Sequence, residues 1–322
     1  QTDPEERVDP NDLIYDWNRL PGSFAYAGSN VELDDETLRD GLQNPTVKDP
    51  PIGRKIEMLH LIAEMGIQAA DIGLPGAGPR AREAVMALAT EIAEQGLPIA
   101  PNCAARTVKA DIAPIVDVAQ ATGLKMEVGA FIGCSPIRQY AEGWGLEMLL
   151  RTTEEAVTFA AQEGLDVMYV TEDTTRSRPE TLKALYTTAI ECGARRICLA
   201  DTVGHSTPFG VRQLVRFVRK VIFDSGEDVK IDWHGHRDRG LAMPNALAAI
   251  EEGADRVHGT ALGIGERVGN TAMDLLLVNL KLLDMHDVDL TRLPEYCRLA
   301  AEICGIKIPH SYPVVGSDAF RT

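Results

Sequence analysis

Eight short strand-like runs alternate with eight longer amphipathic runs along this 322-residue chain, and this alternation restricts its fold more than any other feature. Strands that are separated by helices pair in parallel, because a parallel connection needs a crossover of about a dozen residues or more. The strand-like runs cover residues 30–36, 68–73, 98–103, 125–132, 166–171, 195–201, 229–234 and 256–261. The pattern therefore predicts a parallel α/β fold.

The number of units favours one parallel architecture over the other. Eight units of roughly 30 residues match a (β/α)8 TIM barrel, whereas a doubly wound sheet, the alternative, usually has fewer strands. A glycine suited to end a helix precedes five of the predicted strands, at Gly66, Gly123, Gly164, Gly193 and Gly253. The helix-like runs cover residues 56–65, 82–94, 108–121, 146–162, 179–192, 208–221, 241–251 and 271–283.

The barrel units leave a segment at each end of the chain. We expect an N-terminal extension at 1–28, a TIM-barrel catalytic domain at 29–285 and a short post-barrel helical segment at 286–322. The post-barrel segment contains an amphipathic helix at 293–304 and a proline-containing stretch at 308–315. We expect this segment to be incomplete.

Composition narrows the class of protein. A net charge of −16 argues against nucleic acid as a partner, because phosphates need a basic surface. No apolar run approaches the roughly 20 residues that span a bilayer, so no membrane contact is expected. The six cysteines form no C-x-x-C pair, which favours reduced thiols and a cytoplasmic location.

The sequence His234-Gly235-His236 follows the seventh predicted strand and is a candidate metal-binding pair. Side chains at alternate positions of a strand point to the same face, so the two imidazoles can reach one ion. Asp40, after the first strand, and Asn270, after the eighth, offer further ligands, because active sites of TIM barrels form at the carboxyl ends of their strands. Taken alone, the pair could equally be two hydrogen-bonded loop histidines.

This set of oxygen and nitrogen ligands contains no thiolate and suits a divalent metal such as Mg, Mn or Zn. A structural zinc would be expected to fill its coordination with protein ligands, whereas Asp40, His234 and His236 leave positions open. A 2-oxo acid can bind such a metal through its keto and carboxylate oxygens, and the metal polarises the carbonyl. Arg39 then stands where it can stabilise the oxyanion that forms.

Four segments, in this order, resemble the 2-isopropylmalate synthase and homocitrate synthase family, whose members are TIM-barrel enzymes of the DRE-TIM metallolyase superfamily. The resemblance implies a Claisen-type condensation of acetyl-CoA with a 2-oxo acid, which gives a 2-hydroxy diacid and CoA. It also implies a homodimer. The four segments are residues 35–43, residues 199–204, the His234-Gly235-His236 pair with Gly240 and Asn245, and residues 263–270.

The family resemblance also implies roles for single residues. Asp40, His234 and His236 would bind the metal, with Asn270 as a fourth ligand or close neighbour. Arg39 would contact the keto oxygen, Thr202 the substrate carboxylate, and Gln43 the metal-bound water or the substrate. Glu172 stands at the acidic position of the fifth strand and is the candidate for proton transfer, along with the alternative of a solvated carboxylate.

The chain departs from the family pattern just after the histidine pair. Arg237 and Arg239 stand where relatives usually carry Asn or Asp and an apolar residue, and Arg138 stands where many carry histidine. Arg237 and Arg239 could bind an extra carboxylate or a CoA phosphate. We therefore count Arg237 among the substrate-binding candidates and expect that the 2-oxo acid differs from the apolar acid of leucine synthesis.

Three other functions are alternatives to that of a synthase. A carbon–carbon lyase that resembles hydroxymethylglutaryl-CoA lyase would need a cysteine in the glycine-rich loop, and residues 259–265 contain none. A biotin-dependent carboxyltransferase would need a lysine at the end of the fifth strand, which ends in Thr171-Glu172-Asp173. A non-catalytic metal-binding homologue would have no use for Arg39, Glu172 and Thr202.

Overall fold

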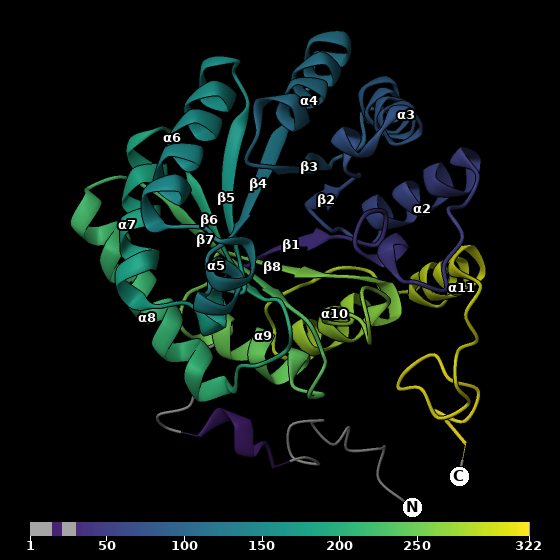
Figure 1. Ribbon diagram of the computed structural model, residues 1–322. Coiled ribbons are helices and arrows are strands. Elements are labelled where there is room, and N and C mark those ends of the chain that lie inside the picture. Colours follow the sequence, from purple (N-terminus) through teal and green to yellow (C-terminus); the bar gives the residue numbers. More distant parts are fainter. Residues whose placement is uncertain (1–14, 21–29, 322) are drawn as a thin grey trace, which may run out of the picture.

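The computed structural model describes residues 15–20 and 30–321, and its centre is a closed barrel of eight parallel strands in the order β1 to β8 (Figure 1). The predicted TIM barrel is confirmed. Most of the predicted extension at 1–28 lies outside the described residues. The strands are β1 Glu32–Asp35, β2 Ala69–Asp71, β3 Ala100–Arg106, β4 Glu127–Gly133, β5 Asp166–Glu172, β6 Arg196–Asp201, β7 Lys230–Gly235 and β8 Arg256–Gly259.

Helices form a ring around the barrel (Figure 1). Those that connect or follow the strands are α2 Ile52–Glu64, α3 Pro79–Gln95, α4 Lys109–Thr122, α5 Pro136–Glu142, α6 Leu146–Gln162, α7 Pro179–Glu191, α8 Pro208–Ser225, α9 Ala242–Glu251 and α10 Met273–Leu282. The sequence prediction missed α5, a seven-residue helix that begins after the Ser135 cap and lies in front of the barrel mouth in Figure 1. The five glycines predicted to end helices all have positive φ.

After the barrel, α11 Leu293–Cys304 has the bounds predicted from its amphipathic pattern and packs beside α2 (Figure 1). Its Tyr296 hydroxyl donates a hydrogen bond to Asp35, whose side chain points outward from β1. Burial raises the pKa of Asp35 to about 6, although the hydrogen bonds from Thr37 and Tyr296 partly oppose this shift. The division at residue 286 stays a prediction. No helix in the described part of the chain combines the length and apolar character needed to cross a membrane.

The strands alternate between an apolar outer face and a polar inner face. Leu33, Ile197, Trp233 and Val257 are fully buried and belong to the core between the strands and the helices. Their neighbours along each strand point inward and carry charged or polar groups, so the barrel interior is lined by polar as well as apolar side chains.

An ion network fills the interior at the amino-terminal end of the barrel. Arg256 Nε donates to Asp232 Oδ2 at 2.6 Å, and Arg196 Nη1 donates to Asp232 Oδ1 at 2.8 Å. Arg256 also contacts Glu127. Burial alone would raise the pKa of Asp232, but the two guanidinium groups hold it well below its usual range. This network closes the barrel floor below the polar groups nearer the mouth.

The Arg256→Met substitution should lower the free energy of unfolding by about 3–5 kcal/mol, because it leaves buried carboxylates without their main counter-charge. The matched control is Arg216→Met, which removes a surface pair between Arg216 and Glu252 and should cost under about 1 kcal/mol. Urea denaturation at neutral pH measures both values.

The same experiment has a defined pH dependence. The pKa of Asp232 is lower in the folded protein than in the unfolded chain, so its ionised carboxylate stabilises the wild-type fold at pH values above the unfolded-state pKa. This stabilisation is lost as the pH falls through the folded-state pKa. Without Arg256 the Asp232 carboxyl can be protonated at higher pH, which relieves the buried charge. The deficit of Arg256→Met should therefore shrink in mildly acidic buffer, and an equal deficit at both pH values would contradict this explanation.

Candidate metal centre and active site

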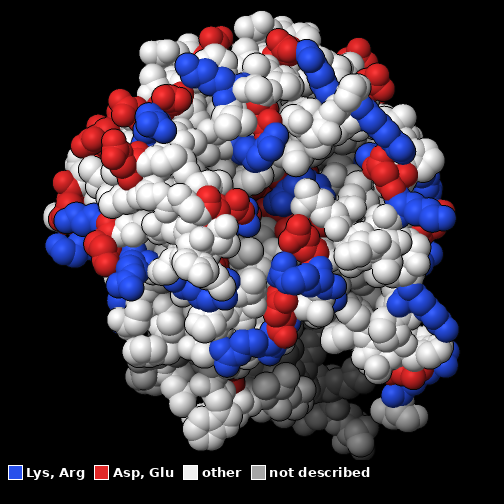
Figure 2. Space-filling model, viewed as in Figure 1, with Lys and Arg blue, Asp and Glu red and all other residues white. Residues whose placement is uncertain are grey.

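The carboxyl ends of the strands surround a cavity of about 250 Å³, which opens at the hollow near the centre of Figure 2. Polar residues gather on one side of it and apolar residues on the other. Among the predicted site residues it is lined by Arg39, Asp40, Gln43, Glu172, Thr202, His234 and His236. The structure thus brings these predicted residues to one place.

Asp40, His234 and His236 form a buried cluster at the polar side of the cavity. The two Nε2 atoms of the imidazoles lie 3.1 Å apart. Asp40 Oδ2 lies 3.4 Å from Nε2 of His234 and 3.6 Å from Nε2 of His236. The alternation along β7 places both rings on the inner face, and Asp40 approaches from the turn before η2 Gly41–Gln43.

The spacing of these donor atoms fits one divalent ion. Ligands about 2.1 Å from a metal are about 3.0 Å apart at right angles and about 3.4 Å apart in a tetrahedron. Asn270 adds a further buried donor, since its Oδ1 has no hydrogen-bond partner while its Nδ2 donates to Asp40 Oδ2 at 2.8 Å. A Cβ on Gly265 would lie 1.9 Å from Asn270 Oδ1, so the glycine at this position is required.

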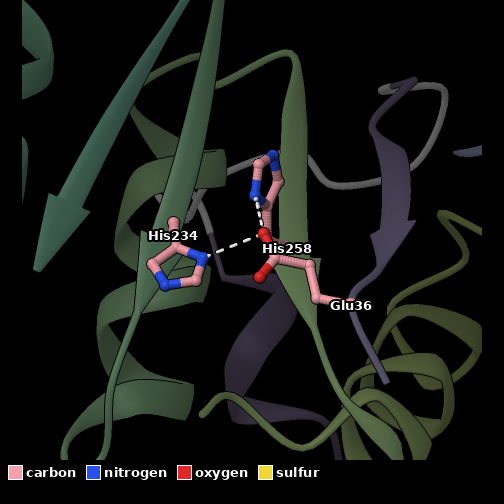
Figure 3. A group of neighbouring side chains, drawn as sticks. All are labelled: Glu36, His234 and His258. Carbon is pink, nitrogen blue, oxygen red and sulfur yellow. Dashed lines mark hydrogen bonds and ion pairs between the residues drawn. The ribbon is translucent and has the colours of Figure 1, made fainter. Parts of the chain in front are cut away.

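A second cluster of Glu36, His234 and His258 supports the first one (Figure 3). Glu36 Oε1 accepts hydrogen bonds from Nδ1 of His234 at 3.1 Å and from Nδ1 of His258 at 2.7 Å. With Nδ1 of His234 bound to a carboxylate, the lone pair of its Nε2 faces Asp40 and His236. A carboxylate behind a histidine is the usual outer partner of a metal-binding imidazole.

His258 is held as an imidazolium between two carboxylates. Burial would lower its pKa, but the hydrogen bond to Asp232 at 2.9 Å, the charge of Asp34 and the bond to Glu36 together raise it to about 10. Both ring nitrogens of His258 are therefore donors, and Glu36 can accept from two imidazoles at once.

Arg39 is surrounded by three carboxyl groups. Its Nε donates to Asp71 Oδ2 at 2.7 Å, its Nη2 contacts Glu36, and its Nη1 lies 3.7 Å from Asp40 Oδ2. Burial raises the pKa of Asp71 to about 7, although the charge of Arg39 opposes the shift. These ion pairs fix the guanidinium at the wall of the cavity, beside the candidate metal ligands.

Glu172 and Thr202 lie at the ends of neighbouring strands, on the same cavity. Burial raises the pKa of Glu172, with Arg138 opposing the shift and Glu266 and Asp173 adding to it. Thr202 Oγ1 accepts a hydrogen bond from the Asp173 backbone N–H at 2.8 Å, which leaves its own hydroxyl hydrogen available to a ligand.

Arg237 is not among the residues that line the cavity, and its predicted contact with the substrate stays a prediction. Its Nε donates to the carbonyl oxygen of Val268 at 2.6 Å, and a Cβ on Gly269 would lie 2.9 Å from the same Nε. Arg239 donates to the carbonyl oxygen of His205 at 2.7 Å. Both arginines therefore donate hydrogen bonds to the backbone of neighbouring loops.

Glu36 and His258 also belong to the site, although neither was predicted as part of it from the sequence. The sequence does contain a signal for His258. Arg256 and His258 stand at alternate positions of β8, and Asp232 and His234 do the same in β7. Polar residues at alternate positions of a buried strand indicate a polar barrel interior. Glu36 gives no such signal, since charged residues at strand ends are common.

Comparison with known proteins agrees with this geometry. A family model described as HMGL-like matches residues 30–299. A homocitrate synthase of Methanopyrus kandleri is 37% identical over 89% of this chain and 69% of its own length. A 2-isopropylmalate synthase of Sulfolobus acidocaldarius is 36% identical over 92% of this chain and 74% of its own length. Relatives of both names are acyltransferases.

Solved structures share the fold at lower sequence identity. Hydroxymethylglutaryl-CoA lyase from Pseudomonas aeruginosa superimposes with a TM-score of 0.72 at 20% identity, over 91% of this chain and 98% of the lyase. The carboxyl transferase domain of Rhizobium etli pyruvate carboxylase superimposes with a TM-score of 0.67 at 15% identity, over 87% of this chain and 48% of that one. The chain belongs to the HMGL-like family, in the group of the 2-isopropylmalate synthases and homocitrate synthases.

Proposed function

We propose that this protein condenses the acetyl group of acetyl-CoA with a 2-oxo acid and releases a 2-hydroxy diacid and CoA. The observation that carries the proposal is the buried Asp40, His234 and His236 cluster with the Arg39 guanidinium beside it, at one side of a cavity. Such a site suits an α-keto carboxylate, which presents two oxygens to a cation and one to a hydrogen-bond donor. Two of the similar relatives are named homocitrate synthase and 2-isopropylmalate synthase, and these names support the same reaction.

Asp40, His234 and His236 would hold a divalent metal, with Asn270 beside them. When bound, that ion supplies Lewis-acid polarisation of the keto group. Arg39 donates to the oxygen on which negative charge develops as the carbonyl is attacked. Thr202 would donate its free hydroxyl hydrogen to the substrate carboxylate, and Gln43, which also lines the cavity, would hydrogen-bond the substrate.

Glu172 would take the proton from the methyl group of the acetyl thioester. It faces the cavity, and burial raises its pKa toward the range in which a carboxylate is a better base. Removal of that proton gives an enolate, whose carbon forms the new bond with the keto carbon. The π electrons of the keto group move onto its oxygen, which then takes a proton to become the 2-hydroxyl group. Water then cleaves the thioester, and the sulfur leaves as the thiol of CoA.

The far side of the cavity supports a 2-oxo acid with a small apolar side chain. It is lined by Leu74, Ala104, Phe131, Met168 and Val170, together with Gly129, Cys198 and Ala200. A second carboxylate placed there would lose its hydration without meeting a cation. On the basis of this apolar lining we propose an acid with an apolar side chain rather than the extra carboxylate that Arg237 and Arg239 suggested.

A panel of 2-oxo acids tests the function and its substrate class. With acetyl-CoA and Mg or Mn, 3-methyl-2-oxobutanoate or 2-oxobutanoate should release free thiol with kcat/KM about 100-fold higher than 2-oxoglutarate, because of the desolvation cost of the second carboxylate. The control omits the 2-oxo acid and measures background hydrolysis. Absence of thiol release with every acid would overturn the proposal, and cleavage of hydroxymethylglutaryl-CoA would favour the lyase alternative.

Removal of a ligand should abolish both metal binding and turnover. We expect Asp40→Ala and His234→Ala to lose at least about 100-fold in metal affinity, since each removes an inner ligand. Arg39→Ala should keep the metal and lose turnover. His205→Ala, which changes an exposed histidine outside the cavity, is the control. Calorimetry with Mn measures binding apart from activity, and unchanged affinity in both ligand variants would reject the site.

Glu172→Gln should lower kcat by about 100-fold or more, because the amide cannot accept a proton. In the wild type, kcat/KM should fall as the pH drops through the raised pKa of Glu172, since the protonated carboxyl is no longer a base. The variant should lose this acid limb while its affinity for Mn stays the same. Glu154→Gln, on the exposed face of α6, is the matched control. A full acid limb in Glu172→Gln would exclude Glu172 as the base.

A further inference from the structure

The post-barrel segment contacts the barrel through two tyrosine hydroxyl groups. Tyr296 lies on α11 and donates to the carboxylate of Asp35. Tyr312 lies in the loop that follows α11 (Figure 1) and donates to Asp274 Oδ2 at 3.0 Å. Both carboxylates are buried, Asp35 at the end of β1 and Asp274 in the first turn of α10. The hydrogen bonding of two buried groups of the barrel therefore depends in part on the post-barrel segment.

Asp274 holds a strained turn that precedes α10. The turn is η5 Ala261–Gly263, in which Leu262 has φ 56° and ψ 12°. This left-handed conformation is unfavourable for a residue with a Cβ and persists only where surrounding contacts hold it. The Leu262 N–H donates to Asp274 Oδ1 at 2.7 Å. Because the Tyr312 hydroxyl binds the other oxygen of the same carboxylate, it helps to keep that acceptor beside the strained residue.

Asp35 supports the same turn through Thr37. Its Oδ1 accepts a hydrogen bond from the Thr37 N–H at 2.8 Å, while its Oδ2 accepts one from Tyr296. Thr37 Oγ1 accepts in turn from the Ala261 N–H at 2.8 Å. The peptide groups of Ala261 and Leu262 are adjacent. Each is therefore held by a series of hydrogen bonds that begins at a tyrosine of the post-barrel segment.

The turn η5 begins the loop that reaches the candidate metal ligands. Gly263 O accepts a hydrogen bond from the Asn270 N–H at 3.1 Å, and Asn270 Nδ2 donates to Asp40 Oδ2 at 2.8 Å. The Glu266 N–H donates to Asp40 Oδ1 at 3.4 Å. A Cβ on Gly269 would clash with Gly263 O, so the far side of the loop packs closely against η5. A shift of η5 therefore moves the groups that contact Asp40.

We propose that Tyr312 and Tyr296 are positioning residues for the metal centre, through which the post-barrel segment fixes the loop beside Asp40. The inference rests on one part of the proposed function, the divalent metal at Asp40 and the two histidines of β7, and not on the reaction. Removal of a hydrogen-bond partner behind a metal ligand typically weakens metal binding by about 10–100-fold. The two hydroxyl groups act further from the ligands, so a smaller effect is expected.

The test measures metal binding apart from turnover. Tyr312→Phe keeps the ring and removes only the hydroxyl, and it should raise Kd for Mn, by calorimetry without substrate, about fivefold, because Asp274 loses a donor that holds it beside η5. Tyr296→Phe should act in the same direction. Tyr169→Phe is the matched control, since its hydroxyl is also buried and is hydrogen-bonded to Thr153 of α6 at 2.8 Å. Urea denaturation compares the stability of all three variants, and the control should keep the wild-type Kd.

A double-mutant cycle tests whether the hydroxyl acts through the carboxylate. Asp274→Ala should raise Kd for Mn more than Tyr312→Phe does, and addition of Tyr312→Phe to it should change Kd no further. If the wild type binds Mn and both tyrosine variants keep its Kd, or if Tyr169→Phe raises Kd equally, the inference is overturned and the proposed function stands. If the wild type binds no Mn, the metal centre of the proposed function fails, and the inference with it.

Discussion

The site depends on one buried carboxylate, Glu36. Burial alone would raise its pKa, yet Arg39 and the two imidazoles hold that pKa well below its usual range, so Glu36 remains charged. A buried charge of this kind is stable only while its partners stay in place. Glu36 therefore ties the rotamers of Arg39, His234 and His258 to one another. The candidate metal ligand and the candidate oxyanion donor take their positions from the same carboxylate.

Below Glu36 the barrel interior is a stack of charged and polar layers. His258 links Glu36 to Asp232, and Asp232 in turn is shared by Arg256 and Arg196. Glu36 and Asp232 are thus each paired with cations of the layers beside them. The interior therefore contains less apolar packing than the layers of branched apolar side chains that fill many TIM barrels. In return it offers a rigid base for three ligands that must meet within a few tenths of an ångström.

The elements of the fold could be predicted from sequence because their signals are local. The period of two in strands and the amphipathic faces of helices are read within a dozen residues, and α6 and α11 were predicted to the residue. The meeting of Asp40, His234, His236 and Asn270 followed from barrel geometry. The direction of the Arg237 side chain could not be predicted, because after a strand ends it depends on the loop backbone. Glu36 was not identified, since its role arises from contacts with side chains of distant strands.

Because the net charge of the chain is −16, the positions of its cations decide where an anionic substrate can bind. Both proposed substrates are anions, and the field of the whole molecule repels them. Attraction must then come from short-range positive groups along the path of approach. Arg39 lies at the wall of the cavity, beside the candidate metal ligands, and supplies such a group. In the proposed reaction this cation and the metal attract the carboxylate and keto oxygens of the 2-oxo acid, whereas the apolar wall opposite them selects its side chain.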